Sequence, residues 1–234
     1  MTWLKRLKVT GDAVSEDGLA GLSRVSDLEW LKIRSGTLRG DFIASYTKLQ
    51  NLKLLWARDP VATDTDVKSL SKLRNLWSLT LYPTQLTDKG LRSLADIPQL
   101  KRLYTGSNGI TDTGIAHLGW ATKIEELALD PTNVTDGAFS HFAEIPTPRE
   151  LRIHGGKLTG KGLSAMSKLQ RLKYLTLRGK QFNDVVIDEV LQVPSVGFLK
   201  LFDTAVSDQA VARFRKQHPN GIDKLTSEQD RWPY

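Results

Sequence analysis

Hydrophobic side chains recur along this chain in a unit of 24 residues, seen most clearly in the segment 76–99. The first half of the segment has an LxxLxL pattern formed by Leu76, Leu79 and Leu81. The second half has apolar residues at a spacing of three, namely Leu91, Leu94 and Ile97. The first pattern is typical of a short strand with alternate residues inward, and the second of an amphipathic helix. The unit therefore predicts a strand followed by a helix.

The same unit occurs nine times without insertion or deletion. The triplet begins at Leu4, Leu28, Leu52, Leu76, Leu100, Ile124, Pro148, Leu172 and Val196. The first apolar helix position keeps the phase and holds Leu19, Ile43, Val67, Leu91, Ile115, Phe139, Leu163, Ile187 and Val211. One strand and one helix cannot bury their apolar sides alone, so such units fold by stacking on their copies. We predict one elongated α/β solenoid over residues 1–219, followed by a closing strand or tail over residues 220–234.

A Thr-Asp pair marks the predicted start of several helices, where Thr87, Thr111 and Thr135 each precede an aspartate. A threonine hydroxyl at this position can accept from an unpaired N–H of the first turn, and the aspartate favours the positive end of the helix dipole. Metal binding is the alternative reading of these pairs. Helix capping is the better explanation, because the pair recurs wherever a helix must begin.

The combination of LxxLxL with TDxGLxxL every 24 residues resembles the leucine-rich repeat family, over Leu4 to Pro219. The match is to the cysteine-containing subtype of F-box adaptors and bacterial repeat proteins. It departs at the position after the strand where that subtype has cysteine or asparagine, because this chain has Thr84, Asn108, Thr132 or Thr204 there, and Gly or Lys in other repeats. These polar groups can still bond turn backbone, less uniformly. The resemblance implies a right-handed horseshoe with parallel strands on the concave side, helices on the convex side and binding on the concave face. No F-box segment precedes the repeats, so the adaptor role is not implied.

Composition narrows the cellular context. The chain is 40% hydrophobic and 25% charged, which is ordinary for a globular protein. No apolar run reaches the ~18–20 residues of a membrane helix, and the sequence MTWLKRLKV lacks the apolar core of a signal peptide. There is no cysteine, which excludes disulfides and thiolate metal sites. Extracellular repeat proteins often close their ends with disulfides, so we expect a cytoplasmic protein without membrane contact or cofactor.

The strand phase predicts which side chains face the concavity. Three columns of nine residues follow, in which seven side chains are aromatic, nine are basic and three are acidic. This face carries a formal net charge of +6, compared with +7 for the whole chain. The three acids, Glu126, Asp130 and Glu150, divide the face into an N-terminal and a C-terminal basic-aromatic patch. The candidate binding residues are Trp30, Lys32, Arg34, Trp56, Arg58, Tyr82, Arg102, Tyr104, Arg152, His154, Tyr174, Arg178, Phe198, Lys200 and Phe202.

In-register residues of neighbouring strands lie ~4.8 Å apart. This spacing predicts four pairs of a cation with a ring, Arg6–Trp30, Lys32–Trp56, Arg58–Tyr82 and Arg178–Phe202. Such pairs also stabilise a sheet that binds nothing, by ~0.5–1 kcal/mol each. Strand preference does not explain rings on the open side in this excess, whereas exposed Trp, Tyr and Arg are typical of binding hot spots. A binding face is therefore the favoured interpretation.

The leading functional hypothesis is a protein partner, acidic in part, that docks in the concavity. Nucleic acid is the second hypothesis, because single strands use basic side chains and rings for backbone contact and base stacking. The belt of acids argues against a phosphate chain along the full face. A third possibility is a toxin-neutralising or effector-type role, which no residue identifies.

The sequence supports a catalytic function less well than a binding function. The stretch Gly155–Gly162, GGKLTGKG, matches a phosphate loop until Gly162, where Ser or Thr is needed to bind magnesium. His117 and His141 share one helix position in adjacent repeats and are more simply solvated residues than metal ligands. His154 has no evident nucleophile beside it. We expect a non-catalytic binding protein in an unknown oligomeric state.

Overall fold

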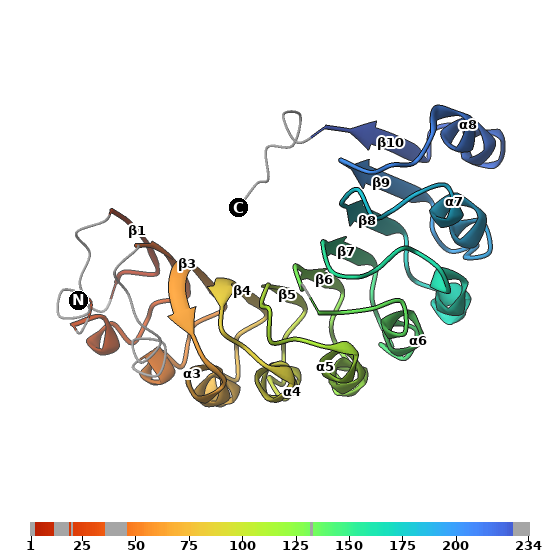
Figure 1. Cartoon of the computed structure of the whole chain (residues 1–234). Coiled ribbons are helices and arrows are strands. Elements are labelled where there is room, and N and C mark those ends of the chain that lie inside the picture. Colours follow the sequence, from red (N-terminus) through yellow and green to blue (C-terminus); the bar gives the residue numbers. More distant parts are fainter. Residues whose placement is uncertain (1–2, 12–18, 20, 36–45, 132, 227–234) are drawn as a thin grey trace.

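The computed structural model describes residues 3–11, 19, 21–35, 46–131 and 133–226. Ten strands form one sheet in the order of the chain, and every neighbouring pair is parallel. The sheet lines the inner side of a curved solenoid (Figure 1). Its strands are β1 (Arg6–Thr10), β2 (Trp30–Arg34), β3 (Leu54–Ala62), β4 (Ser78–Thr84), β5 (Arg102–Thr105), β6 (Glu126–Leu129), β7 (Glu150–His154), β8 (Tyr174–Arg178), β9 (Phe198–Phe202) and β10 (Ile222–Leu225).

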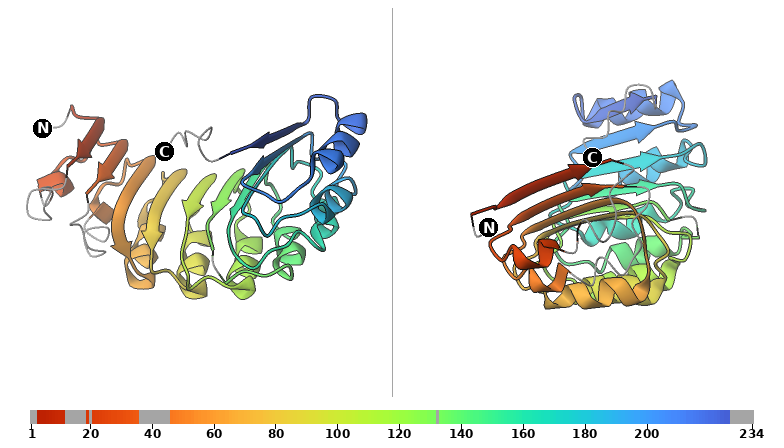
Figure 2. Two further views of the ribbon diagram at one scale, coloured as in Figure 1. Left: turned by 45° about the horizontal axis from the view of Figure 1, so that its top comes forward. Right: turned by 90° about the vertical axis from the view of Figure 1, so that its left-hand side faces the viewer.

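The helices lie on the outer side of the curve (Figures 1 and 2). The α-helices are α3 (Asp64–Lys68), α4 (Asp88–Ala95), α5 (Asp112–His117), α6 (Ala138–Phe142), α7 (Val185–Val190) and α8 (Asp208–Gln217). Several repeats use 3₁₀ turns, which are η1 (Gly21–Arg24), η2 (Tyr46–Lys48), η3 (Ser69–Lys72), η4 (Leu118–Trp120) and η5 (Leu163–Lys168). The predicted amphipathic helices are thus present but short, because each one spans only the width of a repeat.

Strand register confirms the repeat period and the phase. From β1 to β9 the paired residues are 24 positions apart, as Leu31 is from Leu55, except at the end of β3, where the register shifts after Arg58 and Ala62 pairs with Thr84. The second and third triplet residues, such as Leu31 and Ile33, are fully buried between sheet and helices. The alternate residues of the same strand, Trp30 and Lys32, lie on the concave side and are partly exposed.

The last strand, β10, departs from this period. Ile222 pairs with Leu199, an offset of 23 residues, and it supplies a buried side chain at the end of the sheet. Residues 220–225 therefore include a parallel strand that covers β9, while a division of the chain after residue 219 stays a prediction.

An unforeseen ladder of hydrogen bonds joins the helix starts of neighbouring repeats. The Asp88 carboxylate accepts from the backbone N–H of Thr111 at 2.8 Å and from its hydroxyl at 2.7 Å. The same arrangement joins Asp64 to Thr87, Asp112 to Thr135, Asp136 to Thr159 and Asp184 to Ser207. Each aspartate of a Thr-Asp pair thus binds the next repeat in addition to starting its own helix.

Between Asp64 and Ser207 the ladder of hydrogen bonds is interrupted once. Gly160 stands where an aspartate would reach the eighth repeat, and it has a positive φ of 94°. The seventh repeat consequently begins with the 3₁₀ turn η5 rather than an α-helix. Glu189 bridges the same two repeats instead, because its carboxylate accepts from the backbone N–H of Ser164 at 2.9 Å.

Candidate binding surface

The fifteen predicted binding residues all lie on strands of the sheet, at positions that alternate with the buried core residues. Their exposure differs more than the strand phase implies. Tyr82 and Tyr174 are 39% and 54% exposed, whereas Trp56, Tyr104 and Phe202 are 7%, 8% and 5% exposed. These three rings are covered by neighbouring side chains on the concave face. Tyr82 and Tyr174 are therefore the more accessible of these five candidate rings.

The structure confirms the predicted cation–ring pairs Arg6–Trp30 and Lys32–Trp56. The Arg6 guanidinium lies 5.0 Å from the Trp30 ring, and the Lys32 ammonium lies 4.0 Å from the Trp56 ring. Lys32 accordingly helps to cover Trp56. Arg178 instead approaches the Asp203 carboxylate, at 3.4 Å.

The predicted belt of acids is compensated by its neighbours. Glu126 lies 2.8 Å from Arg102 and also accepts from the Tyr104 hydroxyl at 2.6 Å. Glu150 lies 2.6 Å from Arg152. Asp130 accepts from the Tyr82 hydroxyl at 2.9 Å. Several candidate cations in the middle of the face are thus held by carboxylates of the same face.

Positive charge without such carboxylate partners gathers at the N-terminal end. We call the basic residues on the concave side of β1, β2 and β3 the N-terminal basic patch, which comprises Arg6, Lys8, Lys32, Arg34 and Arg58, whether or not each has a carboxylate partner. Within the part of the chain that the structure describes, no carboxylate lies within 4.0 Å of Arg6, Lys8 or Lys32. Burial, with repulsion from Lys8 and Arg58, lowers the pKa of Lys32. The repulsion indicates a local excess of positive charge.

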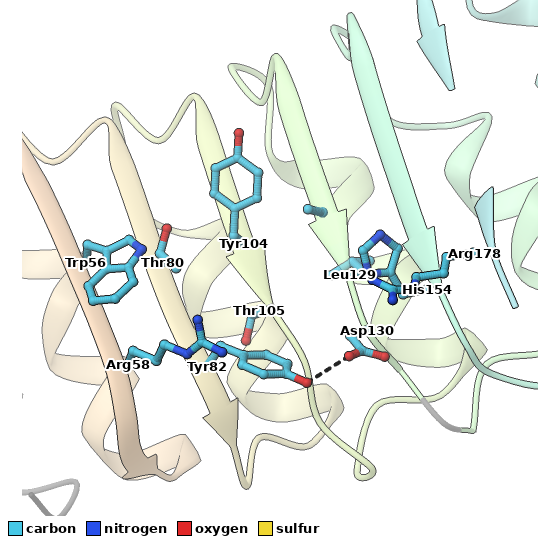
Figure 3. Close-up of a pocket in the computed structure, with 11 residues that line it drawn as sticks. Trp56, Arg58, Thr80, Tyr82, Tyr104, Thr105, Leu129, Asp130, His154 and Arg178 are labelled. Atoms are coloured by element: carbon cyan, nitrogen blue, oxygen red, sulfur yellow. Dashed lines mark hydrogen bonds between the residues drawn. The ribbon is translucent and has the colours of Figure 1, made fainter. Parts of the chain in front are cut away.

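The middle of the concave face contains a depression of about 280 Å³, which we call the central hollow (Figure 3). Its lining extends from β3 to β8 and comprises Trp56, Arg58, Thr80, Tyr82, Tyr104, Thr105, Ala128, Leu129, Asp130, His154 and Arg178. Figure 3 shows the Tyr82 ring extending beneath the hollow to Asp130 on the other side. The hollow brings together six candidate residues from the N-terminal and C-terminal halves of the face, including Trp56 and His154.

His154 is held in its neutral form within this hollow. Burial is the main cause, and the positive charges of Arg178 and Arg152 add to it, so that the pKa of His154 falls to about 3. A neutral imidazole between arginines is a poor general base near neutral pH because its affinity for a proton is too low. The low pKa of His154 therefore argues against a role as a general base near neutral pH.

Acidification is therefore expected to destabilise the fold through His154. The unfolded chain binds a proton at His154 near the ordinary pKa of about 6.5, while the folded chain does not, so stability falls as the pH drops below that value. Between pH 7 and pH 5 the free energy of unfolding should fall by about 1–2 kcal/mol from this group. Urea unfolding of the wild type and of His154→Gln at both values measures it. Equal losses in the two proteins would contradict the assignment.

The C-terminal patch proves mixed in charge rather than basic. The Tyr174 and Phe198 rings lie 6.3 Å apart, and the Lys200 ammonium lies 5.8 Å from the Phe198 ring. A shallow depression beside them is lined by carboxylates as well, from Glu150 and Asp223. Asp223 belongs to β10, which the strict 24-residue period misplaces by one residue, so sequence reasoning missed it.

Trp77 is a second residue that the strand phase did not select. It directly precedes β4 and lies at the edge of the sheet, with the Arg102 guanidinium 5.3 Å from its ring. Lys53, Lys101 and Glu125 line the same open depression. A tryptophan at a position where other repeats have charged residues was the available signal.

The motifs that suggested other chemistry have structural roles. In the stretch Gly155–Gly162, Leu158 is fully buried and Thr159 binds Asp136 of the preceding repeat. Among the residues that the structure describes, no three His, Asp or Glu side chains are placed to hold a metal ion. None of the described helices combines the length and the apolar character that crossing a bilayer requires.

No protein-family model and no curated protein matches the chain. Similar solved structures include internalin C2 of Listeria monocytogenes, with 19% identity, a TM-score of 0.49 and coverage of 92% of this chain and 84% of that one. An internalin from the same organism, InlF, has 15% identity and a TM-score of 0.47, with 95% and 86% covered. The plant peptide hormone receptor RGFR1, in complex with RGF2, has 14% identity and a TM-score of 0.52, with 96% and 39% covered.

At these identities the similarity concerns the fold alone. The in-register parallel sheet, the buried leucine triplets and the outer layer of short helices are the same features that the repeat pattern predicted. Together with the similarity to RGFR1, they show that this chain adopts the leucine-rich repeat fold.

Proposed function

We propose that the chain is a non-catalytic interaction module that binds a partly acidic protein through its concave face. The observation that carries the proposal is the N-terminal basic patch, whose residues Arg6, Lys8 and Lys32 lack carboxylate partners among the described residues. Complementary charge on a partner would relieve this repulsion and guide association. The accessible Tyr82 ring, next to the patch, supplies contact area of the kind that hot spots use.

Nucleic acid is the alternative ligand for this surface, because cations beside rings also suit phosphates and bases. The charge distribution favours protein. Arg102, Arg152 and Arg178 are engaged by carboxylates, so a phosphate chain crossing the face would lose cationic partners after β3. RGFR1, which shares the fold, was solved with RGF2 bound.

We also propose that the repeats are of the 24-residue, cysteine-containing-like subtype. The 24-residue offset from β1 to β9, outside the shift at the end of β3, supports the period. The Thr84 hydroxyl donates to the Gly106 carbonyl at 2.9 Å, as expected of a residue that replaces the cysteine. Thr204, at the corresponding place, has no hydrogen-bond partner among the described residues, which fits the less uniform bonding expected. Thr132 lies outside the described residues, and a cytoplasmic location stays a prediction.

Charge reversal on the patch tests the proposal. Affinity capture from the source organism, read by mass spectrometry, identifies partners, and calorimetry with the purified partner then gives the affinity. Because Lys8 and Arg34 are exposed, the double variant Lys8→Glu/Arg34→Glu should fold and should bind at least about tenfold more weakly.

The matched control reverses two exposed charges on the convex helix α4, Lys89→Glu/Arg92→Glu, and should bind like the wild type. Equal binding by both double variants would show that the concave face is not the interface. A salt titration separates the ligand classes, because phosphate contacts give a steep log–log dependence of affinity on salt. A steep slope would favour nucleic acid.

A further inference from the structure

The central hollow exists because small residues interrupt the large side chains of the concave face. Ala128, on β6, lies between Tyr104 and Arg152 in register and is only 8% exposed at the floor. Gly106 leaves room for the Tyr82 ring, since a Cβ there would lie 2.8 Å from a Tyr82 ring carbon. The Tyr82 ring can therefore reach across to Asp130 and close the lower side of the hollow.

The middle of the central hollow is lined mainly by apolar groups. The rings of Trp56, Tyr82 and Tyr104 surround the floor made by Ala128 and Leu129. His154 adds a further ring, which is uncharged at neutral pH. A concave site of this kind favours a large apolar side chain, because its burial removes apolar area from water on both partners.

Charge at the border of the hollow continues into the N-terminal basic patch. Arg58 belongs to both, and Arg178 lines the opposite side. The guanidinium groups of both arginines act on the Tyr82 hydroxyl, where they partly offset the rise in its pKa that burial and Asp130 produce. An acidic group entering beside the apolar side chain would therefore meet the Arg58 guanidinium, whereas Arg178 is already paired with Asp203.

We propose that the central hollow is the anchor site for a partner segment that presents one large apolar side chain with an acidic residue next to it. The apolar side chain occupies the space above Ala128, and the carboxylate faces Arg58. The rest of the segment continues over the N-terminal basic patch, whose charge complements further acids. This inference rests on the proposed function and specifies the part of the partner that the face recognises.

Selection of peptides from a random dodecapeptide library displayed on phage, against the intact protein, tests the anchor. The enriched peptides should share a large apolar residue with Asp or Glu beside it. Fluorescence anisotropy with the synthetic peptides should show that replacing either residue by alanine weakens binding at least about tenfold.

Two substitutions locate the peptide in the hollow. Ala128→Phe fills the space without changing charge and should weaken binding at least about tenfold, as should Arg58→Gln. Thr10→Phe is the matched control, because it adds the same ring at an exposed concave position on β1, outside the hollow. Circular dichroism and urea unfolding confirm that each variant is folded, and peptide binding to Thr10→Phe should be unchanged.

The outcomes distinguish this inference from the proposed function. If selection enriches no peptide, or if peptides bind Ala128→Phe as well as the wild type, the hollow is not the anchor. Peptides that lose affinity only for Lys8→Glu/Arg34→Glu would overturn the anchor and leave the concave face as the interface. Peptides that are insensitive to all of these variants would overturn both.

Discussion

Replacing Phe139 by alanine is expected to lower the free energy of unfolding by about 3–5 kcal/mol. Phe139 lies on α6, is fully buried, and has its ring 6.3 Å from that of Phe142. It fills the space between the sheet and the helical layer in the middle of the solenoid. Neighbouring repeats are stacked directly against it, so they cannot collapse into the cavity without breaking strand register.

Urea unfolding followed by circular dichroism measures this loss, with Phe198→Ala as the matched control. Phe198 undergoes the same chemical change on the concave face, where its side chain is partly exposed, so less than half the loss is expected. Equal losses at the two positions would mean that the concave rings are as tightly packed as the core.

Repairing the gap in the aspartate ladder by Gly160→Asp should destabilise the protein, by about 2–4 kcal/mol. A comparison of repeats alone suggests the opposite, because aspartate stands at this position in most of them. Gly160, however, has a φ of 94°, which strains any residue with a side chain. A Cβ there would also lie 2.4 Å from a Val186 methyl group.

The matched control is Gly21→Asp, at an exposed glycine of η1 where a Cβ meets no atom within 4 Å. This variant should change the unfolding free energy by less than about 0.5 kcal/mol. A gain in stability for Gly160→Asp, measured by urea unfolding, would show that the seventh repeat readily adopts the helix start of its neighbours.

The fold was predictable because one phase governs the whole chain. Once Leu76, Leu79 and Leu81 are set as a strand, the period places every other strand through β9, and the buried positions follow from alternation. The strand β10 does not follow the 24-residue period, because a one-residue shift in register places Ile222 rather than Asp223 in the core. The local signal for this shift is that Ile222 is apolar whereas Asp223 is charged.

The concave position of the candidate residues was predictable from the sequence, but their exposure and their pairing were not. Alternation places Trp56 on the concave side, yet its 7% exposure depends on Lys32, a neighbour 24 residues earlier. Likewise, counting Arg102 and Glu126 as separate charges overlooks that they neutralise each other at 2.8 Å. The exposure of Trp56 and the neutralisation of Arg102 both depend on contacts between side chains of neighbouring strands. The repeat pattern does not specify the rotamers that form these contacts.

The aspartate ladder is another feature that was not foreseen from the sequence. The Thr-Asp pairs were interpreted as local helix caps, a role that Thr87 has through the N–H of Lys89. The carboxylate of Asp88 is directed to the next repeat instead. A residue that recurs in every unit can serve the contact between units as well as the unit itself.

The acids in the middle of the concave face are paired with basic or hydroxyl side chains of the same face. This pairing affects how a charged molecule approaches the protein. Paired charges produce fields that decay over short distances. Arg6, Lys8 and Lys32, which have no carboxylate partner among the described residues, act over about one Debye length, roughly 8 Å at physiological salt. An approaching anionic molecule is therefore drawn to one end of the horseshoe before it contacts the rest. Orientation during encounter is set there, and it weakens as ionic strength rises.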